Sequence, residues 1–184
     1  MAVNAPALDA PGTPMPEFAL PDVSDGAVFT NEKLAGASAV LVAFICRHCP
    51  YVVHVRDELV RVASEFAPRG VKTIGISAND PVKYPDDAPD RLREMVSEFG
   101  IPFPVLFDES QDVARAFGAV CTPDLFVYDG ELRLFYRGRL DDSTPGNGKS
   151  VTGSDLRQAL DALLAGQPLS SPPQPSMGCS IKWR

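Results

Sequence analysis

Two cysteines separated by two residues, Cys46 and Cys49, are the side chains of this sequence best suited to chemistry. An apolar run precedes them and Pro50 follows at once, which indicates a strand-to-helix junction. Two thiols at this spacing can close a small disulfide ring, and the amino end of a helix stabilises a neighbouring thiolate. Because a thiolate is the nucleophile of thiol–disulfide exchange, the segment predicts a redox-active dithiol.

The two thiols are expected to have different roles in the exchange reaction. We expect Cys46 to be the more exposed and more acidic thiol, because it lies in the turn before the helix, and therefore to attack the substrate. Cys49 then expels the substrate from the mixed disulfide. His48 lies between them, where its imidazole stabilises the thiolate and makes the pair more oxidising; a histidine that only caps the helix is the alternative. Arg47 is expected to contact substrate.

The dipeptide Thr122-Pro123 stands at the entry of a predicted strand, where proline is tolerated, and its peptide bond is a candidate for the cis form. A cis bond there places the loop opposite the dithiol, so that the Thr122 backbone can bind an extended substrate by strand addition. A trans turn is the alternative. Cys121 and Cys179 are candidate auxiliary thiols, although we favour a spectator role for both, Cys179 lying on a tail expected to be mobile.

A zinc site is the chemical alternative to a dithiol. Cys46 and Cys49 have ligand spacing and His54 follows them, but a structural zinc site normally closes with a second pair of ligands. Cys121 and Cys179 stand alone in the sequence. We therefore expect neither a metal nor a cofactor.

Composition narrows the class of protein. The 184 residues suffice for one globular domain, with 45 % hydrophobic and 22 % charged residues. A net charge of -7 without a basic block argues against nucleic-acid binding. There is no basic leader and no run near the ~18 apolar residues that span a bilayer, so we expect no membrane contact and a cytoplasmic location. Four cysteines are too few for a disulfide-stapled secreted scaffold.

Periodicity predicts alternating strands and helices, hence an α/β fold with a mixed central sheet, helices on both faces and an N-terminal β-hairpin extension. Predicted strands cover residues 18–20, 27–30, 37–45, 71–77, 105–107, 124–128 and 132–137. Predicted helices cover residues 50–67, 88–99, 110–117 and 154–165, the last capped by Ser154. We expect a flexible arm over residues 1–16, a redox domain over 17–166 and a proline-rich tail over 167–184. Trp183 near the end of this tail is expected to dock, on the domain or on a neighbour. The long loop 79–87 is expected to overhang the site.

With these features assembled, the chain resembles the thioredoxin-fold superfamily, in the branch of peroxiredoxin-like and thiol–disulfide isomerase proteins. The resemblance rests on the segments 46–52, 75–80, 84–89, 122–123 and 178–184. It implies a thioredoxin-like fold and thiol–disulfide chemistry without a bound cofactor, with Cys46 and Cys49 as the active pair and Pro123 as a cis-proline.

Two departures from the family patterns shape the alternatives. Thioredoxins carry Trp-Cys-Gly-Pro-Cys, whereas this motif is closer to the Cys-x-His-Cys of disulfide isomerases and oxidants. In peroxiredoxins a threonine stands three residues before the peroxidatic cysteine, which proline follows. Cys49-Pro50 matches the second feature, and Cys46 takes the place of the threonine.

The first hypothesis is accordingly a thiol–disulfide oxidoreductase that acts on protein or small-molecule disulfides and exchanges electrons with a thiol donor. The second is a thiol peroxidase, an antioxidant activity, in which Cys49 is oxidised and is resolved by Cys46 or Cys179. The third is a non-enzymatic redox sensor whose acidic loop and apolar tail engage a partner.

Overall fold

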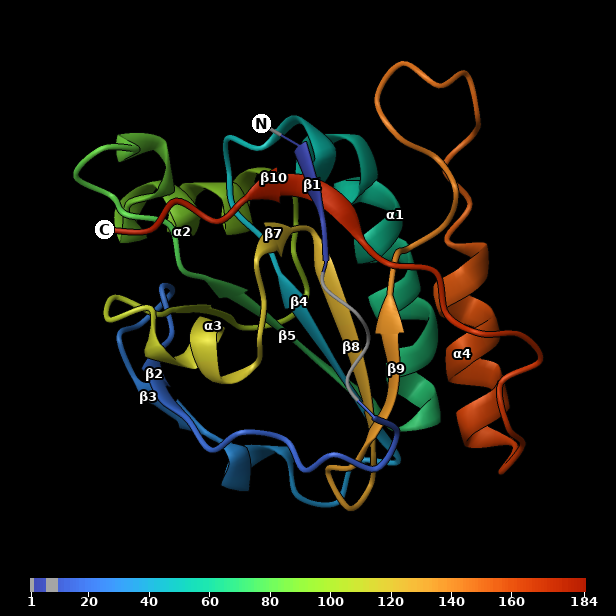
Figure 1. Cartoon of the computed structure of the whole chain (residues 1–184). Helices are drawn as coiled ribbons and strands as arrows, with labels where there is room; N and C mark the ends of the chain where they lie inside the picture. The colour runs from blue at the N-terminus through green and yellow to red at the C-terminus, as the bar shows by residue number, and fades with distance from the viewer. Residues whose placement is uncertain (1, 6–9) are drawn as a thin grey trace.

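Five strands form the central sheet of the computed structural model, which describes residues 2–5 and 10–184 (Figure 1). They are β4 (Ala39–Phe44), β5 (Val71–Ser77), β6 (Val105–Phe107), β8 (Asp124–Asp129) and β9 (Leu134–Gly138). Their order across the sheet is β6-β5-β4-β8-β9. β5 runs parallel to β4 and β6, whereas β8 runs antiparallel to β4 and β9. The predicted mixed sheet is confirmed.

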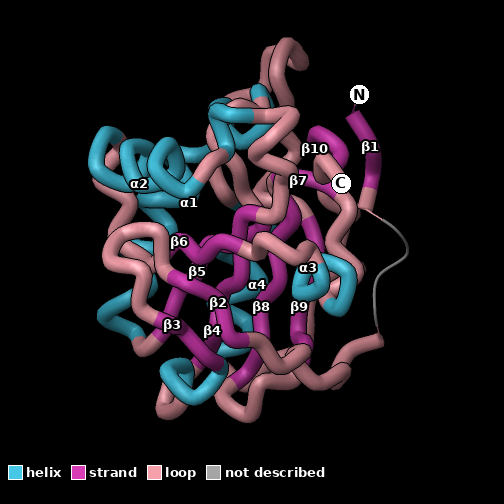
Figure 2. The backbone as a smooth tube through the Cα atoms, turned by 90° about the vertical axis from the view of Figure 1, so that its left-hand side faces the viewer, coloured by secondary structure: helices cyan, strands magenta, loops and turns pink. Residues whose placement is uncertain are grey.

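Four α-helices of the described chain cover the two faces of this sheet. They are α1 (Pro50–Phe66), α2 (Pro89–Glu98), α3 (Asp112–Ala116) and α4 (Ser154–Leu164). Side chains alternate along β4, so that Leu41 belongs to the apolar cluster under α1, α2 and α4 while Val42 belongs to the cluster that includes α3. Figures 1 and 2 show α1 and α4 on one side of the sheet and α3 on the other, as expected.

The predicted N-terminal hairpin is present. It consists of β2 (Ala19–Pro21) and β3 (Val28–Thr30), which pair antiparallel. A bridge between Asp22 and Leu106 places it beside the β6 edge of the sheet. Three short 3-10 helices complete the described elements: η1 (Asn31–Leu34), η2 (Ala67–Arg69) and η3 (Pro85–Asp87).

A second, small sheet joins both ends of the chain to the domain. Its strands are β1 (Ala2–Asn4), β10 (Met177–Ser180) and β7 (Cys121–Thr122), with β10 in the middle. In Figure 1, β10 crosses the end of the central sheet next to β1 and β7. The expected flexible arm and tail therefore each contribute a strand, which their proline content does not predict. Residues 6–9 of the arm lie outside the described residues, and the domain boundaries stay a prediction.

The tail beyond β10 is packed onto the domain. The side chain of Ile181 is only 3 % exposed, within the apolar cluster that includes α3. Trp183 packs against the same cluster, and the guanidinium of Arg115 lies 4.3 Å from its ring. The predicted docking of Trp183 is confirmed. None of the helices in the described chain has the length and apolar character needed to cross a membrane.

Candidate active site

Cys46 and Cys49 lie where β4 leads into α1. The amide of Ile45 still bonds to Ile76 of β5, so the sheet continues to the residue before the motif. Cys49 is the N-cap of α1 and Pro50 is its first residue, a position where the missing N–H costs nothing. Both thiols are free, and both residues are buried, at 1 % and 0 % exposure. The sequence predicts that the Cys46 thiol is exposed, and this prediction is wrong.

Four hydrogen-bond donors and one acceptor, the Thr122 carbonyl 3.2 Å away, lie around the Cys49 sulfur. The thiol of Cys46 donates to it, and so do the thiol of Cys179, the Val52 amide and the Thr122 hydroxyl. Together these donors lower the pKa of Cys49 from 9.0 to about 4, with the Cys46 contact as the largest cause and burial acting against it. Cys49 is therefore the thiolate of this cluster at neutral pH.

The pKa of Cys46 is raised well above its usual range. The largest cause is its hydrogen bond to Cys49, followed by burial and by the charge of Asp87. Its sulfur lies 3.3 Å from the Thr122 hydroxyl, which acts in the opposite direction. The predicted order of acidity is therefore wrong: α1 begins at Pro50 as predicted, but the contacts that lower a thiol pKa converge on its N-cap, Cys49, and not on Cys46.

The buried carboxylate of Asp87 organises the turn between the two cysteines. Its Oδ1 accepts hydrogen bonds from the amides of Arg47 (2.8 Å) and His48 (3.2 Å). Its Oδ2 lies 2.5 Å from Nδ1 of His48 and accepts a bond from the Asn79 side chain at 2.7 Å. Asp87 is 0 % exposed and comes from the loop that was expected to overhang the site. That loop does reach the motif, but as a buried support for the turn rather than as a cover.

The side chains of Arg47 and His48 face α2 and the 79–87 loop. Arg47 forms ion pairs with Glu94 (3.0 Å) and Glu98 (3.2 Å), so its guanidinium is already engaged, and its predicted contact with substrate has no support in this arrangement. The His48 ring stacks on Tyr84, with centroids 5.2 Å apart. Its described polar partner is the Asp87 carboxylate, which differs from the predicted contact with a thiol.

The Thr122-Pro123 peptide is cis, as predicted, and its loop lies opposite the dithiol. Cys46 contacts the Thr122 hydroxyl, and the Cys49 sulfur lies 3.2 Å from the Thr122 carbonyl. Cys121 is also buried, but its sulfur points to the Pro123 carbonyl, 3.8 Å away, and burial raises its pKa. Its contacts are those of the predicted spectator.

Cys179 is placed differently from the prediction. It lies on β10, opposite Thr122 in the strand register, and its thiol hydrogen-bonds to that of Cys49. Burial, together with the Cys49 contact, raises the pKa of Cys179 to about 11. The third thiol of the cluster is thus on an ordered strand and not on a mobile tail.

The tail is held near the site by residues that the sequence argument missed. Asn79 accepts the Lys182 amide at 2.8 Å, and the Gln111 side chain donates to the Lys182 carbonyl at 2.9 Å. Both side chains are buried, at 3 % and 1 % exposure. In the sequence, Asn79 lies in the segment 75–80, on which the family resemblance partly rests, but that resemblance assigns it no role.

One trio of described residues has the chemistry of a metal site. A sulfur of Cys46, a nitrogen of His48 and an oxygen of Asp87 all lie within 4.8 Å of one another. The nitrogen and the oxygen are already engaged with each other. His54, the ligand considered from the sequence, instead contacts the Ser143 hydroxyl at 2.8 Å.

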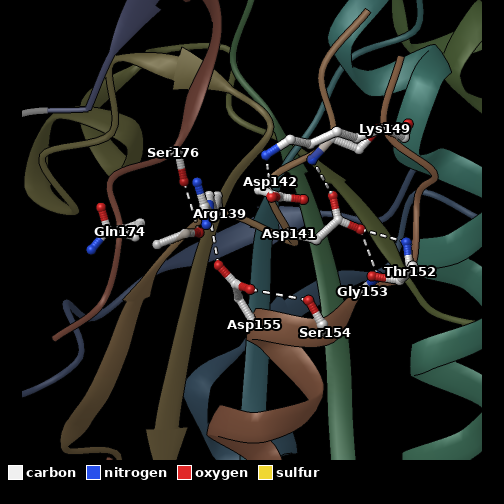
Figure 3. Close-up of polar contacts among 12 residues, drawn as sticks. Arg139, Asp141, Asp142, Lys149, Thr152, Gly153, Ser154, Asp155, Gln174 and Ser176 are labelled. Carbon is white, nitrogen blue, oxygen red and sulfur yellow. Dashed lines mark hydrogen bonds and ion pairs between the residues drawn. The ribbon is translucent and has the colours of Figure 1, made fainter. Parts of the chain in front are cut away.

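A cavity of about 240 Å³ opens beside the cis-proline, with Tyr51, His54, Pro123 and Met177 on its wall. Its far side is the loop shown in Figure 3, which Asp141 holds by accepting the amides of Thr152 and Gly153, both at 2.6 Å. The sequence predicts Ser154 as the N-cap of α4, whereas the N-cap in the structure is Gly153. The cavity gives the first turn of α1 an open side.

Comparison with known proteins agrees with this arrangement. Residues 11–137 match the family model that is described as the AhpC/TSA family. The chain belongs to the AhpC/TSA family. A crystal structure of an uncharacterized conserved protein from Geobacillus kaustophilus is 47 % identical, with a TM-score of 0.96 over 100 % of this chain and 97 % of that one. The hypothetical protein SMc02350 of Sinorhizobium meliloti 1021 is 44 % identical, with a TM-score of 0.95 over 98 % of both chains.

Two further relatives carry functional names. The thiol:disulfide interchange protein DsbE of Allochromatium vinosum is 30 % identical over 131 residues, which are 70 % of this chain and 65 % of that protein. A thiol:disulfide interchange protein of Chlorobium tepidum, 24 % identical, has a TM-score of 0.64 over 85 % of this chain and 99 % of its own, which shows a shared fold. This member of the AhpC/TSA family thus has the thioredoxin-like fold.

Proposed function

We propose that this protein is a thiol–disulfide oxidoreductase in which Cys49 is the attacking thiol. The observation that carries the proposal is the position of Cys49 at the N-cap of α1, where the donors around its sulfur lower its pKa to about 4. The cis-proline loop beside it and the interchange activity named for the DsbE relative both support the same class of reaction. The proposal exchanges the roles that the sequence predicts for Cys46 and Cys49.

In the proposed reaction the Cys49 thiolate attacks one sulfur of a disulfide and releases the other as a thiolate. A second protein thiol then attacks Cys49 in the mixed disulfide and releases the remaining substrate thiolate. Two thiols contact Cys49 and can take this step, Cys46 from the motif and Cys179 from β10. Protein or small-molecule disulfides as substrates, a thiol electron donor and a cytoplasmic location stay predictions.

The test is disulfide exchange with oxidised glutathione, followed by the release of reduced glutathione. Cys49→Ser should abolish the release, because a serine hydroxyl is not ionised at neutral pH. Cys121→Ser is the matched control, since it changes a buried thiol with no contact to Cys49 in the described hydrogen bonds. An unchanged rate of release in Cys49→Ser would refute the proposal.

Peroxide reduction is the second candidate, and two observations favour it. Cys49 precedes Pro50, and the Cys46 thiol donates to Cys49 from the position where peroxiredoxins carry a threonine hydroxyl. In addition, β10 already occupies the Thr122 edge, which leaves a small oxidant at an advantage over an extended peptide. Rapid consumption of hydrogen peroxide by the reduced protein, lost in Cys49→Ser, is the expected result; a rate no faster than that of free cysteine would exclude this candidate. The redox-sensor hypothesis stays a prediction.

A further inference from the structure

Strand β10 lies along the backbone of Thr122, where the sequence predicts that a substrate strand binds. It pairs antiparallel with β7, with Cys179 opposite Thr122 and Ser180 opposite Cys121. This pairing uses the backbone edge immediately before the cis-proline, where strand addition was expected. Residues 177–180 of the described chain thus occupy the edge at which a peptide was expected to bind.

Gly178 allows this close docking. A Cβ atom built on Gly178 would overlap the Thr122 carbonyl group, so a larger residue would push β10 away from β7. Beyond the strand, buried Asn79 and Gln111 bind the backbone of Lys182, and Ile181 is buried in the core. Four separate residues therefore fix the position of β10.

This docking delivers the Cys179 sulfur to the amino end of α1. The amide of Tyr51 donates to the Cys179 sulfur, while the next amide, that of Val52, donates to the Cys49 sulfur. The two thiols also hydrogen-bond to each other. The strand pairing agrees with this placement, because Cys179 lies opposite Thr122, whose carbonyl is 3.2 Å from the Cys49 sulfur.

We propose that β10 is a tethered counterpart of a bound substrate strand, and that its Cys179 is the thiol that closes the first disulfide on Cys49. The inference rests on the proposed function and names the resolving residue of that site. Cys179 is partly exposed whereas Cys46 and Cys49 are buried, so the cluster meets solvent on the side of β10.

The electrons and atoms balance with a small disulfide as the oxidant. The Cys49 thiolate bonds to one substrate sulfur, the substrate S–S bond breaks, and one substrate thiolate leaves. Cys179 loses its proton to solvent, its sulfur bonds to that of Cys49, and the second substrate thiolate leaves. The protein has then lost two electrons to the substrate, and an external dithiol reductant returns them by the reverse exchange.

The surroundings of the two candidate thiols favour Cys179 over Cys46 once Cys49 has reacted. Bonding to substrate removes the negative charge of Cys49, which had opposed ionisation of both neighbours. Cys46 is still disfavoured as a thiolate by burial and by the charge of Asp87. Burial is also the largest cause that raises the pKa of Cys179, but this residue is only partly buried, and the Tyr51 amide and the positive charge of Lys182 lower its pKa.

The experiment is a disulfide map of the full chain. The reduced protein is mixed with one equivalent of oxidised glutathione, quenched with acid at intervals and analysed by peptide mass spectrometry. The first intramolecular disulfide is expected between Cys49 and Cys179. In Cys179→Ser, glutathione should stay on Cys49, and release of the second glutathione should slow by about tenfold or more, because the pre-positioned thiol is gone. Cys121→Ser is the matched control and should behave as wild type.

A second variant moves the strand but keeps the thiol. Gly178→Val should displace β10 and suppress the disulfide between Cys49 and Cys179, while the first glutathione is still released. Should this variant not fold, the Cys179→Ser map alone decides. A disulfide between Cys46 and Cys49 in wild type, with equal release in Cys179→Ser, would overturn the inference but leave the proposed function standing. No glutathione release from wild type would instead overturn the proposed function itself.

Discussion

Replacing Cys46 by alanine removes the largest contribution to the low pKa of Cys49. The Cys46 thiol donates a hydrogen bond to the Cys49 thiolate, and an alanine at this position has no donor. Replacing Cys46 by serine instead keeps a donor of similar size, which resembles the threonine of peroxiredoxins. The two substitutions therefore separate the hydrogen bond from the mere presence of a second thiol.

The size of the effect follows from the charge on the acceptor. A hydrogen bond to an ionised group contributes about 1.5 to 3 kcal/mol, and one pKa unit corresponds to about 1.4 kcal/mol. Losing the Cys46 donor should therefore raise the pKa of Cys49 by about one to two pH units from its value of about 4. The serine variant should stay close to wild type.

The assay is the pH dependence of Cys49 alkylation by iodoacetamide, quantified on the Cys49 peptide by mass spectrometry. Because the folded pKa lies below the ordinary value of 9.0, the thiolate persists as pH falls and reactivity is lost only near the folded pKa. The midpoint of that loss should move upward in Cys46→Ala only. Identical midpoints in wild type and Cys46→Ala would refute the assignment of Cys46 as donor.

Three further predictions concern the support of the site. Asp87→Ala should reduce the free energy of unfolding by about 2 to 4 kcal/mol in urea, because the amides of Arg47 and His48 lose their acceptor. Asp87→Asn keeps an acceptor oxygen and should cost less; equal losses would contradict this role. Ile181→Ala should cost about 2 to 4 kcal/mol and Ile181→Val about 1 kcal/mol, since this side chain is 3 % exposed. A neutral Ile181→Ala would mean that the tail is not packed in solution. Cys121 should resist alkylation in the native protein, because it is buried and its pKa is raised, and should react only after unfolding; native labelling as fast as that of Cys179 would count against the arrangement.

The sequence predicts well those elements whose pattern is local. The apolar run before Cys46 is strand β4, Pro50 begins α1, and Val71–Ser77 is β5 with the predicted bounds. For the bond before Pro123 the residues alone left cis and trans open, and the resemblance to the thioredoxin-fold superfamily implied the cis form that is found. Each of these signals lies within a few residues of the feature that it predicts.

The failures involve contacts between distant residues. The peroxidase hypothesis named Cys179 as one of two possible partners of Cys49, but nothing near Cys179 in the sequence indicates the contact, because it depends on β10 pairing with β7. Asp87 is one of three aspartates in its loop, and burial under the motif, which the sequence does not show, distinguishes it. The acidity of Cys49 over Cys46 depends on contacts from Thr122 and Cys179, which are distant in the sequence, and on the charge of Asp87 beside Cys46, so a correctly predicted helix start did not reveal it.

The close approach of Gly178 to the Thr122 carbonyl restricts which residue can occupy this position of the strand. Any other peptide that replaced β10 in the same register would place the residue before its cysteine against that carbonyl, where a Cβ does not fit. A peptide in that register would therefore fit beside the cis-proline only with glycine before its cysteine.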